Sequence, residues 1–145
     1  MKIIDCKESV HSRAILGILN HAIVNSTALF DYDPRPLASM KTWFQVKREN
    51  DYPVKGAVND DGELLGFVTY GQFRAFPAFK YTVEHSIYVH PDHLGKGLGD
   101  QLLQTIIACA KEQEKHVLVG GIEASNQASI HLHEKHGFTC SGIIK

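Results

Sequence analysis

Apolar residues alternate with polar ones in some stretches of the chain and recur at helical spacing in others, which predicts a mixture of strands and helices. The stretches that favour strands are Lys2–Asp5, Val54–Val58, Leu64–Tyr70, Tyr81–Val89, His116–Ile122 and Phe138–Ile144. The stretches that favour helices are Ser9–Val24, Leu37–Glu49, the segment that begins near Leu98, and Ile130–His136. The expected order of elements is therefore β-α-α-β-β-β-α-β-α-β, an α/β arrangement.

Local signals refine this pattern at several junctions. The run from Asn59 to Gly62 (NDDG) lies between two expected strands and predicts a hairpin. The run 25–35 favours a loop, and Gly137 is placed to supply the left-handed cap of the last helix. Because 116–122 is mostly apolar, we expect that strand to be buried on both faces.

The segment EHSIYVHPDHLGKGLGD, residues 84–100, carries the strongest chemical signal. An alternating strand ends at Pro91, three glycines follow at alternate positions (Gly95, Gly97 and Gly99), and a helix begins. Glycines let the backbone approach a ligand closely, and the first N–H groups of a helix have no internal partner. The segment therefore predicts a cradle for an anion, most simply a pyrophosphate.

Two common nucleotide-binding loops do not fit this segment. A Walker loop needs Ser or Thr after its lysine, whereas Gly97 follows Lys96. A Rossmann fingerprint needs G-x-G-x-x-G and an acidic residue about 20 positions further on, where this chain has Val119. A different family of pyrophosphate-binding loops is therefore expected.

Composition narrows the class of protein. The chain has 145 residues, a formal net charge of −1 and no run of Lys or Arg, so we expect one domain (1–145) with neither nucleic acid nor membrane as its partner. Its cysteines, Cys6, Cys109 and Cys140, are odd in number and widely spaced, which favours reduced thiols and a cytoplasmic location. There is no signal-peptide pattern and no apolar run of about 18 residues.

The run LGKGLG (Leu94–Gly99) resembles the acetyl-CoA loop of the GCN5-related N-acetyltransferases, [QR]-x-x-G-x-[GA]. The resemblance implies the fold of that family, a mixed central sheet flanked by helices, and acetyl-CoA as co-substrate. Leu94 departs from the pattern, because relatives carry Gln or Arg there. Its side chain offers no hydrogen bond, but the backbone donors remain, so we expect acetyl-CoA binding to be weakened at most.

Longer stretches resemble one branch of that family, the phosphinothricin and methionine sulfone or sulfoximine N-acetyltransferases. They are GQFRAF (71–76), YTVEHSIYVHPDH (81–93) and LHEKHGF (132–138). The resemblance implies acetylation of the α-amine of a small L-amino acid. Acetylation of a peptide N-terminus and a non-catalytic acyl-CoA-binding module remain alternatives. Many family members are homodimers, but no dimer surface is evident in the sequence.

The resemblance also implies which residues hold the cofactor. Pantetheine amides are expected to pair with the strand at Ile87, Tyr88 and Val89, where a backbone N–H polarises the thioester carbonyl. The other implied cofactor residues are Gly95, Lys96, Gly97, Leu98, Gly99, Asp100, Asn126 and Ser129. Asn126 has a second interpretation, since a residue at that place can simply cap the helix that follows.

Acyl transfer to an amine requires removal of a proton, and Glu84 is the candidate base. Position alone is more typical of a solvated or ion-paired carboxylate at a strand edge, so the catalytic role comes from the resemblance. His133 stands where many relatives have Tyr, as a candidate general acid for the departing thiolate or a group that orients the acceptor. A histidine on a helix surface is the other interpretation.

The acceptor site is expected around Arg74, whose guanidinium can bind a carboxylate with two parallel hydrogen bonds. Phe30 and Phe73 are expected to form an apolar wall, although both fit the core equally well. Some relatives have a second basic residue where this chain has Phe76, which favours acceptors without extra anionic groups.

Two further expectations concern metal and the end of the chain. His131, His133 and His136 do not share one helix face, so no metal site is predicted. The branch has a further strand and an aromatic, Arg-bearing segment beyond the position of Lys145. Without that part, an outer strand is missing and a strand edge is left unpaired.

Overall fold

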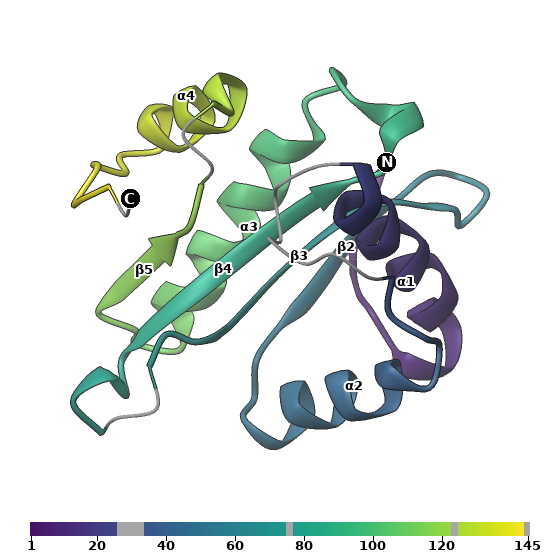
Figure 1. The fold of residues 1–145 in the computed structure, drawn as a ribbon, viewed down its shortest axis with the longest axis horizontal. Coiled ribbons are helices and arrows are strands. Elements are labelled where there is room, and N and C mark those ends of the chain that lie inside the picture. The colour runs from purple at the N-terminus through teal and green to yellow at the C-terminus, as the bar shows by residue number, and fades with distance from the viewer. Residues whose placement is uncertain (26–33, 75–76, 123–124, 144–145) are drawn as a thin grey trace.

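The computed structural model describes residues 1–25, 34–74, 77–122 and 125–143. Its five strands are β1 (Lys2–Asp5), β2 (Val54–Val58), β3 (Leu64–Gln72), β4 (Thr82–Val89) and β5 (Val117–Gly120). They form one sheet in chain order, antiparallel throughout except for the parallel pair β4–β5. The helices are α1 (Glu8–Asn25), α2 (Ser39–Glu49), α3 (Leu98–Glu112) and α4 (Gln127–Lys135). This mixed sheet with its helices confirms the expected α/β arrangement (Figure 1).

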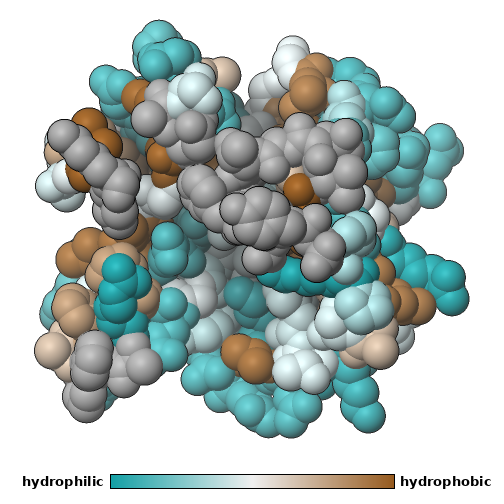
Figure 2. Space-filling view, in the orientation of Figure 1, coloured by the Kyte–Doolittle hydropathy of each residue, from teal (hydrophilic) through white to brown (hydrophobic). Residues whose placement is uncertain are grey.

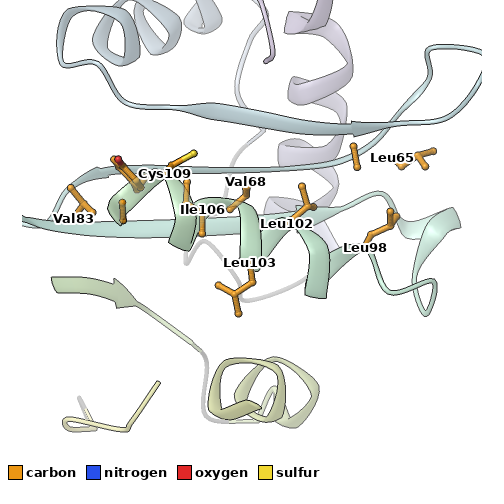
Figure 3. Packing of buried hydrophobic residues seen from close by; sticks show 11 residues of the cluster. Leu65, Val68, Val83, Leu98, Leu102, Leu103, Ile106 and Cys109 are labelled. Atoms are coloured by element: carbon orange, nitrogen blue, oxygen red, sulfur yellow. The ribbon is translucent and has the colours of Figure 1, made fainter. Parts of the chain in front are cut away.

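The helices pack on both faces of the sheet, because β3 sends apolar side chains to each. Phe67 packs with Ile15 of α1 and Phe44 of α2, whereas its neighbour Val68 packs with Leu102 of α3. Figure 3 shows the cluster that contains Val68, in which side chains of α3 pack against those of β3 and β4. Full burial of a side chain of this size stabilises the fold by about 1.5–3 kcal/mol. The central position of β3 explains why it is buried over most of its length.

The expected hairpin between β2 and β3 is confirmed. Asn59 donates its N–H to the carbonyl of Glu63 over 3.1 Å, and its side-chain oxygen accepts from the N–H groups of Asp61 (3.1 Å) and Glu63 (2.9 Å). Gly62 has φ of 79°, a conformation that favours glycine. The turn chemistry alone therefore sets the register of this hairpin.

The cap of α4 is also as expected. Gly137 has φ of 90°, and the N–H groups of Gly137 and Phe138 donate back to the carbonyls of Glu134 and His133, each over 3.0 Å. The helix itself starts earlier than the apolar pattern suggested, at Gln127, because Asn126 caps it.

Two expectations about the last strands are wrong. The strand expected over 116–122 is limited to β5, and it is not buried on both faces: Val117 is 50% exposed. Among the described residues β5 pairs only with β4, so it is an edge strand, and an apolar run cannot distinguish an edge from a centre. Residues 138–143 of the expected last strand form no strand; the backbone of Phe138 instead completes the cap of α4.

The surface carries few large apolar groups. In the view of Figure 2, hydrophobic residues appear as separate patches among hydrophilic ones. No helix within the described part of the chain is both long and apolar enough to cross a membrane.

Candidate active site

The glycine-rich segment forms an exposed turn between β4 and α3. After Val89 the chain makes a short 3-10 turn, Pro91–His93, started by His90, whose Nδ1 accepts from the N–H of Asp92 over 3.1 Å. Gly95 and Gly97 both have φ of 77°, and Gly97 is the left-handed N-cap of α3 with no side-chain cap. The first N–H groups of α3 therefore stay available to an anion, as the sequence predicts.

The side chains around this turn divide into anchors and exposed groups. Leu98 is 4% exposed and fixes the start of α3 in the core, whereas Gly95, Lys96 and Gly97 are exposed. Leu94 is 66% exposed, so the position that is Gln or Arg in the motif points away from the core. Lys96 is the nearby cation, with Nζ 3.1 Å from Nδ1 of His93.

The sheet opens beside this turn. β5 pairs with β4 from Thr82 to His85, opposite Val117 to Gly120, and β4 then runs on to Val89. Figure 1 shows the chain after β5 turning away from β4 toward α4. The β5-facing edge of β4 over residues 86–89 is thus left uncovered by β5, and an extended ligand can add to such an edge as a strand does. The predicted cofactor residues Ile87, Tyr88 and Val89 lie here.

Glu84 lies at the end of the β4–β5 ladder. It is exposed, it pairs with Gly71 of β3, and it therefore projects toward the face covered by α1 and α2. A Cβ built on Gly121 would lie 2.9 Å from Oε2 of Glu84, so the carboxylate occupies the space that this glycine leaves open. Among the described residues, no ion pair engages this carboxylate. Its role as the catalytic base stays a prediction.

His133 is buried, at 6% exposure, and contacts a histidine that the sequence analysis did not identify. Nε2 of His133 lies 2.9 Å from Nε2 of His85, the neighbour of Glu84 on β4, and Nδ1 of His133 lies 2.7 Å from the carbonyl oxygen of Ser129. Phe138 packs on both rings, with centroid distances of 5.4 Å and 5.1 Å. His133 is therefore not a histidine on an exposed helix face. The available signal for His85 was a histidine between Val83 and Ile87 on the apolar face of a strand.

Burial keeps both imidazoles neutral. It lowers the pKa of His85 to about 4; the nearby His133 lowers that pKa further, and the Val119 carbonyl partly opposes both effects. Burial likewise lowers the pKa of His133, with the Ser129 carbonyl raising it and His136 lowering it. Neither ring is charged near neutral pH.

α4 is fixed to the glycine turn through its polar ends. Asn126 caps the helix by accepting from the N–H of Ser129 over 3.2 Å, which confirms the capping interpretation. At the other end, Asp100 in the first turn of α3 accepts from His136 over 2.7 Å and Lys135 over 3.0 Å. These two partners lower the pKa of the Asp100 carboxyl. The Asp100 contacts therefore join the C-terminal end of α4 to the first turn of α3, while contact of Asn126 and Ser129 with a cofactor stays a prediction.

The expected acceptor residues are only partly described. Phe30 and Phe76 lie outside the described residues. Arg74 is exposed, its Nη1 donates to the carbonyl of Phe73 over 2.9 Å, and its guanidinium lies 4.2 Å from the Phe73 ring centroid. Phe73 in turn packs edge-on against Phe79 at 5.6 Å. The Arg74–Phe73 pair stands just beyond the end of β3, with the planar donor set still exposed.

Lys47 of α2 is a second cation on this side that the sequence analysis missed. Its Nζ donates to the Tyr70 carbonyl over 3.0 Å and lies 5.1 Å from the Trp43 ring centroid. It would be 3.6 Å from a Cβ on Gly71, the register partner of Glu84, so Lys47 lies on the same face of the sheet as Glu84. Burial lowers the pKa of Lys47 to about 8. A lysine that follows Trp43 by one helical turn was the available signal.

The family comparison decides what this arrangement belongs to. The model of the acetyltransferase (GNAT) family matches residues 20–138. The chain belongs to the GNAT family. GNAT enzymes are acyltransferases with acetyl-CoA as acyl donor, and the exposed turn and uncovered β4 edge fit that donor. Within the described residues, no group of three or more His, Cys, Asp or Glu side chains is placed to hold a metal ion.

Relatives with named activities extend this result. The chain is similar to the L-methionine sulfoximine/L-methionine sulfone acetyltransferase of Pseudomonas paraeruginosa, with 47% identity over 128 residues that cover 88% of this chain and 74% of the relative. It is also similar to the phosphinothricin N-acetyltransferase of Alcaligenes faecalis, with 32% identity over 91% of this chain and 67% of the relative.

The chain is also similar to several solved structures of N-acetyltransferases. An N-acetyltransferase of Staphylococcus aureus has a TM-score of 0.94 at 44% identity, covering 97% of this chain and 84% of that one. A GNAT phosphinothricin acetyltransferase of Sinorhizobium meliloti, in complex with acetyl-CoA, has a TM-score of 0.93 at 28% identity, covering 97% and 76%. A ribosomal-protein-alanine N-acetyltransferase of Brucella melitensis has a TM-score of 0.95 at 35% identity, covering 98% and 86%.

Proposed function

We propose that this GNAT enzyme transfers the acetyl group of acetyl-CoA to the α-amine of a small L-amino acid, of the methionine sulfone, methionine sulfoximine or phosphinothricin type. The observation that carries the proposal is the position of Glu84. Its carboxylate has no ion pair among the described residues and lies at the point where β5 leaves β4. A general base at the start of the uncovered β4 edge faces both an incoming amine and the thioester.

In the proposed reaction Glu84 takes a proton from the acceptor ammonium, directly or through a water molecule. The neutral amine then forms a C–N bond with the thioester carbon while the C–S bond breaks, and the leaving sulfur ends as the thiol. A backbone N–H near Val89 stabilises the charge that develops on the carbonyl oxygen. Acetyl-CoA supplies the activated acyl group, so no other cofactor is needed.

Arg74 is proposed to bind the acceptor carboxylate. Its guanidinium is exposed and lies 4.2 Å from the Phe73 ring centroid, and its planar donor set suits bidentate contact with a carboxylate. Lys47 adds positive charge on the face where Glu84 projects. A compact acceptor with one carboxylate and a neutral polar side chain suits this pair of cations.

Acetylation of a peptide N-terminus is the second candidate, because the Brucella structure named above carries that activity in its name. A peptide has no free α-carboxylate at its first residue, so Arg74 would have no partner there. A third possibility, an acyl-CoA-binding module without turnover, would leave Glu84 without a function.

The test is release of CoA thiol from acetyl-CoA in the presence of L-methionine sulfone, L-methionine sulfoximine, phosphinothricin, other free L-amino acids or a short peptide with a free N-terminus. We expect release with the small acceptors and little with the peptide. Glu84→Gln should lower kcat by about 10²–10⁴-fold, the range of a positioned acid–base group, with acetyl-CoA binding unchanged.

Three outcomes oppose the proposal. Turnover confined to the peptide would favour the second candidate, and acetyl-CoA binding without any release would favour the module. A Glu84→Gln variant as active as the parent protein would exclude Glu84 as the base.

A further inference from the structure

The buried contact between His85 and His133 limits where the protons of the pair can be. Ser129 offers a backbone carbonyl, which only accepts, at 2.7 Å from Nδ1 of His133. The Ser129 hydroxyl, which can donate or accept, is further away, with its Oγ 3.5 Å from the same nitrogen. The much shorter carbonyl contact therefore determines that Nδ1 of His133 carries a hydrogen. In a neutral imidazole the other nitrogen then has a lone pair, so Nε2 of His133 is an acceptor.

The same reasoning assigns the hydrogen of the His85 ring. Nε2 of His85 is 2.9 Å from Nε2 of His133, a hydrogen-bond distance that needs one hydrogen between the two nitrogens. Since Nε2 of His133 accepts, Nε2 of His85 donates. Nδ1 of His85 is then the remaining lone pair. It is the one buried side-chain nitrogen or oxygen in the described part of the chain without a hydrogen bond of good geometry, although the Val119 carbonyl lies near enough to raise the pKa of His85.

The packing around the pair leaves little room for another arrangement. Both rings are about 95% buried, with 5% and 6% exposure. A Cβ on Gly120 would lie 3.0 Å from Cε1 of His85 and 3.3 Å from Nε2 of His133, so β5 passes against both rings. Phe138 covers them from the end of α4.

We infer that His85 is a positioning residue of the transferase: its Nε2–H fixes the orientation of the His133 ring, whose Nδ1–H donates to the Ser129 carbonyl. The inference rests on the proposed function for its catalytic meaning. The lone pair on Nε2 of His133 already accepts from His85, and its Nδ1–H already donates to Ser129. His133 therefore acts through its fixed ring position and has no free nitrogen to protonate the leaving sulfur.

Several groups face the pair and set its protonation. α4 contributes the Ser129 carbonyl and, one turn further on, His136, which is bound to Asp100 of α3. β5 contributes the Val119 carbonyl, which favours the charged form of His85. Glu84 precedes His85 on β4 but projects to the opposite face of the sheet. Removal of the His85 donor should therefore act on His133 without moving the proposed base.

Two variants of matched length separate positioning from packing. His85→Gln keeps an N–H donor near the place of Nε2, whereas His85→Met fills similar space without a donor. The readout is the ¹⁵N spectrum of histidine-labelled protein, which distinguishes protonated from unprotonated imidazole nitrogens. A His133→Asn spectrum assigns the His133 signals.

We expect His133 in the wild-type protein to be neutral and protonated at Nδ1 at pH 7, and the Gln variant to retain this form. In the Met variant the Ser129 carbonyl should keep the hydrogen on Nδ1, and the Nε2 signal should move to that of a lone pair with no hydrogen-bond donor. Because the ring loses its fixed position, kcat should fall at least about tenfold in the Met variant and be retained in the Gln variant.

A wild-type His133 protonated at Nε2 would overturn the inference, even if neither variant folds. So would a Met variant with the wild-type spectrum and kcat. Because the spectrum needs no acceptor, it reports on the pair even if the enzyme proves inactive toward amino acids, which would count against the proposed function alone.

Discussion

At the scale of single residues, the candidate site depends on two neighbours on β4 that point to opposite faces. Glu84 projects toward α1 and α2, and His85 toward α4. Both can approach the end of β5 because Gly120 and Gly121 have no side chains there. The double glycine, which the sequence analysis did not single out, is therefore a steric requirement of the site.

Gly121→Ala tests this requirement. The new Cβ would lie 2.9 Å from Oε2 of Glu84, the far end of a flexible side chain, so the carboxylate must move by a fraction of an ångström. Displacement of a reacting group by about 1 Å costs on the order of 10²-fold in rate, so we expect a fall in kcat smaller than about 10²-fold in the thiol-release assay, with unchanged acetyl-CoA affinity. Gly17→Ala in α1, where an added Cβ meets nothing within 4 Å, is the control and should leave kcat unaltered.

Arg74 allows a second test at this scale. Arg74→Ala should raise the KM for the amino acid about 10–100-fold, because a charge-assisted bidentate contact contributes roughly 1.5–3 kcal/mol. Arg74→Lys should recover only part of the loss, since lysine lacks the planar fork. The assignment would be wrong if the KM values for acetyl-CoA and the amino acid rose equally.

At the scale of elements, the start of α3 and the helix α4 form the proposed cofactor side of the site. Gly97 starts α3 without a side-chain cap, and Asp100 in its first turn is bound to His136 of α4. This contact joins the C-terminal end of α4 to the start of α3. The turn is therefore built by backbone conformation, and the departure at Leu94 changes a side chain that is 66% exposed.

Leu94→Arg should therefore strengthen acetyl-CoA binding. The added guanidinium would stand beside the proposed pyrophosphate, and an exposed contact of this kind contributes about 0.2–1 kcal/mol, or up to about fivefold in Kd. Calorimetric titration at low and high salt measures the change, which should shrink with salt. Leu94→Met is the uncharged control. An equal effect of both variants would point to packing and not to charge.

At the scale of the whole molecule, the two apolar clusters on either face of β3 hold the sheet and helices together, and few polar groups are buried among them. Thr69, His85 and His133 are the buried polar residues of the described chain, and Lys47 is a partly buried cation between α2 and the sheet. Such groups make the stability of the fold depend on pH.

Lys47 gives the clearest case of such a pH dependence. Burial lowers its pKa in the folded state to about 8 from an ordinary value of 10.5, so the unfolded chain binds more protons between these two pH values. As pH rises from 8 to 10.5, deprotonation of Lys47 should therefore increase the free energy of unfolding by at most about 3 kcal/mol.

The measurement is urea unfolding of the parent protein and Lys47→Met across this range. The difference between the two isolates Lys47 from Cys6, whose pKa burial raises to about 12 and whose contribution has the opposite sign. If the two proteins kept a constant difference in stability from pH 8 to 10.5, the proposed shift would be absent.

Local chemistry in the sequence was sufficient to determine most elements and the glycine turn. The short apolar runs of β1 and β2, the NDDG hairpin and the left-handed Gly137 each depend on neighbours in the chain, so their patterns predicted them. The strand expected at 138–143 failed because a strand exists only with a partner to pair with, and Phe138 instead caps α4 and covers two histidines.

The motif resemblance identified Glu84, Arg74 and His133 as candidates, but only the tertiary structure decided what surrounds them. The contact of His85 with His133 joins residues 48 positions apart, and that of Lys47 with the Tyr70 carbonyl joins residues 23 positions apart. Neither of these contacts produces a local pattern in the sequence. Whether a histidine is charged, and which nitrogen carries its hydrogen, depends on burial and on partners that packing alone brings together.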